Sequence, residues 1–154
     1  MSAENVELVR SIHPGPDFDL ALLVNDDRAC DRWRDAHGHL FDPSVQCTMR
    51  LPGMAPVSYS GLSGLRDAWR DRLRRWSSYR DEIEDVIDGG VRAVVLHRHR
   101  GRPKPGADEI TQRSATVWNV RDGRIESVDF NIPYAEALAW IGVANTSSKL
   151  RLRG

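Results

Sequence analysis

The stretch from Val91 to Asn131 constrains the fold most, because it predicts three consecutive β-strands. Two prolines lie within Gly101–Gly106, and proline lacks the N–H that a strand ladder needs, so the chain must turn there. Asp122-Gly123 supplies the positive φ of a tight hairpin. Two hairpins in succession predict an antiparallel meander. Apolar and β-branched residues mark its strands as Val91–Leu96, Ile110–Val120 and Ile125–Ile132.

The rest of the chain supplies helices and two further strands. Leu62, Leu65, Trp69, Leu73 and Trp76 recur at spacings of three and four, which is the strongest helical period in the sequence. Pro52–Gly61 is expected to be a loop. Helices are predicted over Glu4–Ile12, Asp27–Leu40, from Ser63 onward and over Tyr134–Ile141, with one or two helical turns in Phe18–Val24 and strands over Val45–Leu51 and Tyr79–Ile87.

Length and charge exclude several classes of protein. The 154 residues suit one domain over 1–144, followed by a flexible polar and basic tail over 145–154. Lys plus Arg and Asp plus Glu each number 22, so the formal net charge is zero, which argues against a nucleic-acid binder. No apolar run is long enough to span a bilayer, so a cytoplasmic protein without membrane contact is expected. Cys30 and Cys47 show no metal-ligand spacing and predict two reduced thiols.

The ordered pattern of the second half resembles a known family. The stretches YRDEIEDVIDGGVRAVVLHRHRGR, EITQRSATVWNVRDGRIESVDF and AEAL are similar to the polyketide-cyclase-like (SnoaL-like) branch of the nuclear transport factor 2-like superfamily. The resemblance covers nearly the whole chain, although His13–Leu40 is longer than the family's usual second-helix segment. It implies an α+β class: a cone-shaped α+β barrel whose curved mixed or antiparallel sheet carries three N-terminal-half helices over its concave face and a short C-terminal helix. It also implies a homodimer and a largely apolar pocket.

The resemblance and the strand alternation together predict the pocket. Because side chains alternate along a strand, Gln112, Ser114, Thr116 and Trp118 share one face. Trp69 and Trp76 either join them or serve only as core. The full set of predicted pocket residues is Gln46, Thr48, Trp69, Trp76, Leu96, Gln112, Ser114, Thr116, Trp118, Val128 and Phe130. The expected ligand is a hydrophobic small molecule with a polar or anionic end, and no cofactor is expected.

The carboxylates used by similar enzymes are missing from the corresponding positions. Alignment with the ketosteroid isomerases places Thr116 and Thr48 where those enzymes carry their two acids. Alignment with the limonene epoxide hydrolases places Arg98, Leu96 and Phe130 on the Asp-Arg-Asp unit, and Gln46 and Thr48 on the water-holding residues. The family's cyclases use a lone acid, and Asp129, Asp108 and Glu109 are candidates that can equally be surface carboxylates.

The remaining candidates for chemistry are Arg98, His97 and His99. His97 and His99 lie two residues apart on a strand and share a face, so they can pass a proton or bind one metal. No third ligand is visible, because His13, His37 and His39 have no recognised spacing, and no metal is expected. Arg98 either anchors an anionic or carbonyl-bearing ligand or pairs with Glu82 or Glu84 on the neighbouring strand.

Two functions stay open on these residues. The first is a cofactor-independent cyclase, isomerase or hydrolase that acts on a polyketide- or steroid-like ligand through Arg98 and a pocket histidine. The second is a non-catalytic ligand-binding or protein-interaction module on the same fold. A pocket filled by Trp69, Trp76, Trp118 and Phe130 would favour the module, whereas an open cavity with polar groups at its floor would favour a ligand site.

Overall fold

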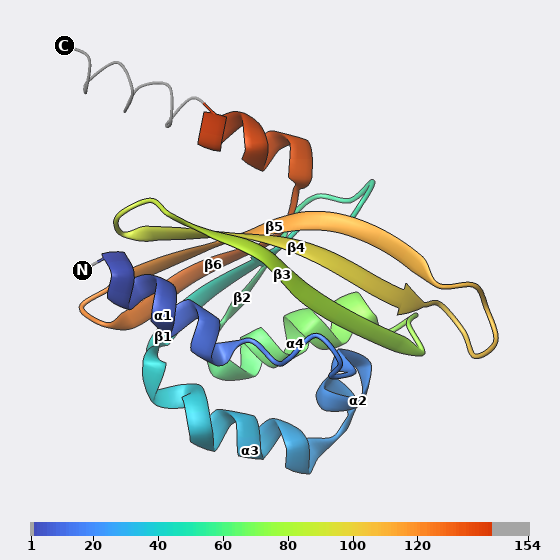
Figure 1. Ribbon diagram of the computed structural model, residues 1–154. Coiled ribbons are helices and arrows are strands. Elements are labelled where there is room, and N and C mark those ends of the chain that lie inside the picture. The colour runs from blue at the N-terminus through green and yellow to red at the C-terminus, as the bar shows by residue number, and fades with distance from the viewer. Residues whose placement is uncertain (1, 143–154) are drawn as a thin grey trace.

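The structure, a computed structural model, describes residues 2–142. The tail expected over 145–154 and the domain boundary at 144 lie outside these residues. The first half of the described chain is mainly helical and the second half is a sheet (Figure 1). The elements are α1 Ser2–Ile12, α2 Leu20–Asn25, α3 Asp27–His37, the 3-10 helix η1 Gly38–Leu40, β1 Phe41–Met49, β2 Val57–Ser60, α4 Gly61–Leu73, β3 Ser78–Asp88, β4 Arg92–Arg102, β5 Ile110–Arg121 and β6 Arg124–Pro133, and residues 134–142 are helical.

The predicted meander forms the body of one six-stranded sheet with the order β2-β1-β6-β5-β4-β3. Its strands pair antiparallel except β1 and β6, which run parallel and join the N-terminal half of the chain to the meander. Asp122 and Gly123 have φ values of 50° and 75°, which confirms the hairpin turn expected between β5 and β6. The sheet is strongly curved but open, so it corresponds to a cone and not to a closed barrel (Figure 1).

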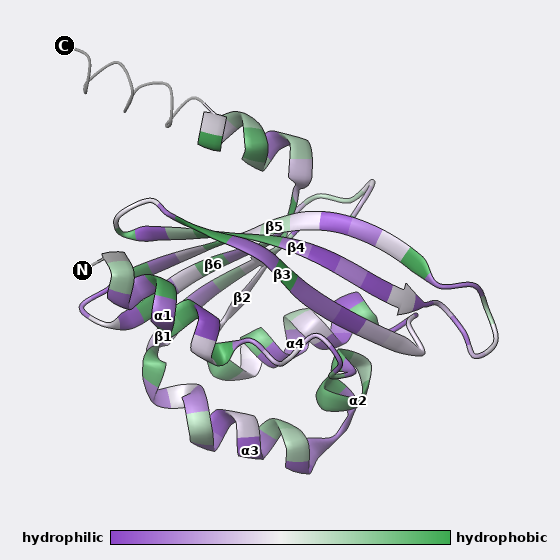
Figure 2. Cartoon of the chain, viewed as in Figure 1, coloured by the Kyte–Doolittle hydropathy of each residue, from purple (hydrophilic) through white to green (hydrophobic). Residues whose placement is uncertain are grey.

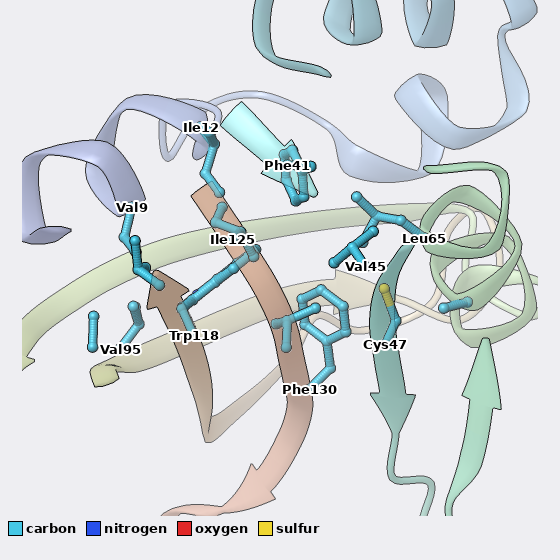
Figure 3. Packing of buried hydrophobic residues seen from close by; sticks show 14 of the residues in the cluster. Val9, Ile12, Phe41, Val45, Cys47, Leu65, Val95, Trp118, Ile125 and Phe130 are labelled. Carbon is cyan, nitrogen blue, oxygen red and sulfur yellow. The ribbon is translucent and has the colours of Figure 1, made fainter. Parts of the chain in front are cut away.

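Helices cover the two faces of the sheet unequally. Helices α1 to α4 lie on the concave face, and the helix of residues 134–142 lies on the opposite, convex face (Figure 1). Four helices cover the concave face instead of the predicted three, because Leu20–Asn25 forms a separate helix capped by the Asp19 carboxylate. The main core lies between this layer and the sheet, where side chains from α1, α4, β1, β5 and β6 point toward one another (Figure 3).

A bulge in β3 changes which residues face inward. Ile83 pairs with His97 but Asp85 pairs with Leu96, so Glu84 is an extra residue in the ladder. Before the bulge, Tyr79 and Asp81 point to the concave face, and after it the inward position passes to Val86. Figure 2 shows hydrophilic stretches along β3 and β4.

Several boundaries differ from the sequence-based expectations. Strand β1 begins at Phe41 and not at Val45, although Pro43 lies within it. The segment Pro52–Gly61 contains β2, which pairs with β1; four residues with two serines are too short and polar to stand out as a strand. The helix expected over Asp27–Leu40 ends at His37 and continues as η1. The first strand of the meander, whose apolar part is Val91–Leu96 and which was expected to include His97 and His99, continues through the predicted break at Gly101 to Arg102, and Gly101 lets its end pass close to the Trp76 ring.

Gly101→Ala should destabilise the protein. A Cβ atom at Gly101 would lie 2.7 Å from the Trp76 ring and 2.9 Å from the Ser78 carbonyl oxygen. Overpacking of this kind typically costs about 1–3 kcal/mol of unfolding free energy, to be measured by urea denaturation. Gly15→Ala is the matched control, because nothing lies within 4 Å of its Cβ position. Equal stability of the two variants would contradict the predicted clash.

Candidate functional site

A cavity of about 310 Å³ lies between the concave face of the sheet and helices α2, α3 and α4. Its wall is mainly apolar, and three of its rings pack edge to face: Phe130 lies 5.1 Å from Trp69 and 5.6 Å from Trp118, centre to centre. The aromatic side chains thus line the space without filling it. The apolar lining comprises Ile12, Leu20, Leu23, Val24, Trp33, Leu62, Leu65, Trp69, Trp118 and Phe130.

One end of the cavity is polar and consists of a hydrogen-bonded set across three strands. His97 Nδ1 lies 2.8 Å from Asp81 Oδ1, and its Nε2 lies 2.9 Å from the Thr116 hydroxyl. Since the carboxylate accepts, Nδ1 carries the proton, and in the neutral ring Nε2 accepts from the hydroxyl. Both ends of the imidazole are therefore fixed. The side chains of His97 and Asp81 are only 3% and 9% exposed.

A second histidine supports the same carboxylate. His99 Nδ1 lies 3.5 Å from Asp81 Oδ1, and its Nε2 lies 2.5 Å from the Ser114 hydroxyl. Burial lowers the pKa of His99 to about 3, so the ring is neutral at physiological pH. Burial by itself would raise the pKa of Asp81, but the electrostatic interaction and hydrogen bond with His97, with smaller contributions from His99 and His13, outweigh it and keep that pKa below its usual value. Asp81 is thus held as a buried carboxylate.

His13 joins this set from the helical layer. It follows directly after α1, and its ring centre lies 5.5 Å from those of His97 and Trp118. Its Nδ1–H donates to the Val9 carbonyl at 2.6 Å, which leaves Nε2 with a lone pair. Burial, followed by the charge of His97, lowers the pKa of His13 to about 4, so this ring is also neutral. His13, Asp81 and His97 all line the cavity.

The structure brings about half of the sequence-predicted residues to this site or beside it. His97, Trp69, Thr116, Trp118 and Phe130 line the cavity. Trp76, Gln112 and Ser114 line a second hollow, larger at about 820 Å³ and more open, near the start of β5, and Val128 is buried in the main core. His99 lies behind His97, away from the cavity, and its ring stacks on that of His97 with the ring centres 5.3 Å apart.

Arg98 points away from the cavity. Its Nη2 donates to Glu82 Oε2 at 2.7 Å on the convex face, so of the two roles considered for Arg98 the structure forms the ion pair. Leu96 lies on the same face of β4 and packs against Ala115 and Ile132. The expectation that Arg98 and Leu96 line the pocket is therefore corrected, because alternation sends them opposite to His97.

The same correction applies to β1. Val45, Cys47 and Met49 are buried in the core on the concave face, so Gln46 and Thr48 lie on the other side of the strand. Gln46 accepts a hydrogen bond from Ser60 of β2 there. The alternation along this strand was predicted correctly, but the choice of the inward face was not.

Sequence reasoning missed Asp81 and set His13 aside because it had no recognised ligand spacing. Asp81 had a signal: it alternates with Tyr79 and Ile83 at the start of β3, which places it on the face of a buried aromatic residue. His13 had none, because only the packing of α1 against β3 and β4 brings it to His97. The candidate acids Asp129, Asp108 and Glu109 do not line the cavity.

The open curved sheet, its helical layer and the cavity between them define a cone-like α+β fold. A family model described as "SnoaL-like domain" matches residues 28–128. The chain therefore belongs to the SnoaL-like domain family, within the nuclear transport factor 2-like superfamily. No curated protein matches the chain.

Solved structures share this fold at low sequence identity. One is a protein from Jannaschia sp. CCS1 that is described as a putative SnoaL-like polyketide cyclase. It has a TM-score of 0.60 and 18% identity over 83% of this chain and 84% of that one. A protein of unknown function with the same superfamily fold, from Burkholderia pseudomallei K96243, has a TM-score of 0.61 and 18% identity over 88% and 95% of the two chains. TerC, co-crystallised with polyporic acid, has a TM-score of 0.55 and 18% identity over 77% and 92%. Within residues 2–142, no helix is long and apolar enough to cross a membrane.

Asp81→Ala should destabilise the protein by about 1–3 kcal/mol, because it leaves the buried Nδ1–H of His97 without an acceptor. Glu82→Ala is the matched control on the same strand: its exposed ion pair with Arg98 is expected to contribute less than about 1 kcal/mol. Asp81→Asn should recover part of the loss, since its amide oxygen can still accept. Urea denaturation measures all three, and an Asp81→Ala effect no larger than that of Glu82→Ala would contradict the prediction.

Proposed function

We propose that this protein binds a small, largely hydrophobic molecule in the cavity, with the molecule's polar group at His97 and Thr116. The observation that carries the proposal is the shape of the site: an apolar wall that closes on one buried hydrogen-bonding group. Such a lining with few polar groups is typical of small-molecule sites, and the cavity lies at the lower end of their usual range of roughly 300–1,000 Å³. The co-crystallisation of TerC with polyporic acid supports a ligand site in this fold.

The surrounding charges favour a neutral polar end over an anionic one. Arg34, Arg66 and Arg70 line the helical side of the cavity, but each is paired with an aspartate: Arg34 with Asp31, and the other two with Asp27. A carboxylate ligand would have to compete with these partners. A carbonyl or hydroxyl group can instead exchange hydrogen bonds with the Thr116 hydroxyl and His97 Nε2.

Proton transfer on the bound molecule is the second candidate function. Asp81 holds His97 by its Nδ1, so the ring is oriented with Nε2 free to serve the ligand once Thr116 turns away. This pair takes the place that the sequence analysis gave to Arg98 and a pocket histidine. The reaction class is then acid–base chemistry such as isomerisation or cyclisation of a carbonyl compound.

Two further expectations belong to the proposal. The family resemblance suggests a homodimer, which size-exclusion chromatography with light scattering would test. A cytoplasmic location is likewise proposed. If no ligand binds, a non-catalytic protein-interaction module on the same fold is the alternative.

Leu23→Trp should weaken ligand binding at least about tenfold, because Leu23 lines the cavity and an indole would occupy ligand space. Leu22→Trp is the matched control, because Leu22, the preceding residue on α2, is 66% exposed and points outward. Binding is measured by thermal shift and tryptophan fluorescence against polyaromatic ketones, steroids and small carboxylates, all in the presence of EDTA. The cavity proposal fails if both variants bind a hit equally well, or if nothing in the panel binds.

His97→Gln should slow proton transfer by about 10²-fold or more while ligand binding persists. For each ketone that binds, exchange of the α-hydrogens for deuterium is followed by NMR in D₂O. His39→Gln serves as control, since His39 is exposed on η1 and does not line the cavity. Binding without exchange above the buffer rate would favour the non-catalytic module.

A further inference from the structure

We propose that His13, Asp81 and His97 form a binding site for a divalent transition-metal ion such as Zn²⁺ at the polar end of the cavity. One donor atom from each residue can be chosen so that all three lie within 4.8 Å of one another. The inference rests on the proposed function only in where it places the organic ligand next to the ion. Metal binding itself is measured without that ligand.

The ring geometry suits a shared ion. The centres of the His13 and His97 rings lie 5.5 Å apart. Two imidazoles on one tetrahedral ion, with Zn–N bonds of about 2.0–2.1 Å, place their ring centres roughly 5 Å apart. The observed ring spacing is therefore compatible with a shared ion, and binding requires the donor atoms, now within 4.8 Å of one another, to close around it. Asp81 Oδ1 and His97 Nδ1, now 2.8 Å apart, would separate to the roughly 3.3 Å that two donors of one tetrahedral ion require.

Hydrogen bonds already fix the nitrogens that would not bind the ion. His13 donates its Nδ1–H to the Val9 carbonyl, so Nε2 is the available donor. In His97 an ion would replace the proton on Nδ1, and Nε2–H would then donate to Thr116, whose hydroxyl can accept as well as donate. Ligating histidines in metalloproteins commonly hold their second nitrogen in this way.

The carboxylate is supported from its other side. His99 Nδ1 lies 3.5 Å from Asp81 Oδ1 and has no hydrogen-bond partner within the described residues. Its Nε2 is held by Ser114, so the ring is positioned to donate to the carboxylate through Nδ1. Asp81 therefore keeps its orientation when the proton between it and His97 gives way to an ion.

The donor set selects the metal and leaves room for a ligand. Two imidazoles and one carboxylate suit Zn²⁺, Co²⁺, Ni²⁺ or Fe²⁺ and not Mg²⁺ or Ca²⁺, which prefer oxygen ligands. Three protein ligands leave a coordination position open, as in catalytic zinc sites. Because all three residues line the cavity, the carbonyl or hydroxyl oxygen of the bound molecule can take that position. His97 cannot serve as a base while its Nδ1 binds the ion, so the metal-loaded protein would act by polarising the carbonyl.

The test is a Co²⁺ titration of protein freed of metal by EDTA and then dialysed. We expect a visible absorption band that saturates at one Co²⁺ per chain and is displaced by Zn²⁺. His13→Gln should weaken Co²⁺ binding by more than about 100-fold and Thr116→Val by about 10–100-fold, the range for loss of an outer hydrogen bond. His39→Gln, which alters an exposed histidine outside the cavity, should bind like the wild type.

Clear outcomes overturn the inference. It fails if the wild type shows neither the band nor Co²⁺ binding in equilibrium dialysis, or if His13→Gln binds as tightly as the wild type. Circular dichroism checks that each variant folds, and Asp81→Asn replaces His13→Gln if that variant does not. If organic ligands bind in the presence of EDTA but the protein does not bind Co²⁺, the metal site is rejected and the proposed function stands. If Co²⁺ binds but no organic ligand does, the metal site stands and the proposed function is rejected.

Discussion

A carboxylate at the floor of an apolar cavity needs hydrogen-bond donors around it, because burying an unpaired charge costs several kcal/mol of folding free energy. In this protein the carboxylate is Asp81, whose donor is His97 of the neighbouring strand, with the Nδ1 atom of His99 close by at 3.5 Å. Each histidine is in turn held by a hydroxyl of the next strand, Thr116 or Ser114. The result is a polar ladder across β3, β4 and β5. The antiparallel register of these strands is what aligns its members.

The cavity lies where helices α2, α3 and α4 leave a space above this polar ladder of the sheet. Trp69 and Trp118 each pack edge to face with Phe130, so the three rings line the cavity and do not fill it. Nearer the N-terminus, Val9 and Ile12 of α1 close the core (Figure 3) and carry His13 to the ladder. Apolar walls strengthen every electrostatic interaction at the polar end, since they lower the local dielectric constant. The same few residues can therefore orient a ligand, transfer a proton or hold a metal ion.

The two faces of β4 have opposite roles. His97 and His99 serve the cavity, whereas Arg98 between them belongs to a partly exposed ion pair with Glu82. A shift of one residue in the strand would exchange these roles. The positions at which similar enzymes carry their carboxylates hold none here, yet an acid still reaches the cavity. Here that acid is on β3, on the strand at the edge of the sheet.

Local signals in the sequence determined the elements of the fold. The hairpin at Asp122-Gly123, the helical period of α4 and the sharing of one face by His97 and His99 all depend on neighbours within a few residues, so they could be predicted. Strand β2 was missed because it is defined by its pairing with β1 and not by its own residues. The sequence also suggested that Thr116, Trp118 and Phe130 belong together. Only the tertiary structure decided which face of β1 and β4 points inward, and only it brought Asp81 and His13 to His97. Alternation places neighbouring side chains on opposite faces of a strand, but which face points inward depends on the helical layer that packs against the sheet. His13 and His97, which the helical half of the chain separates in the sequence, meet only when that layer has packed.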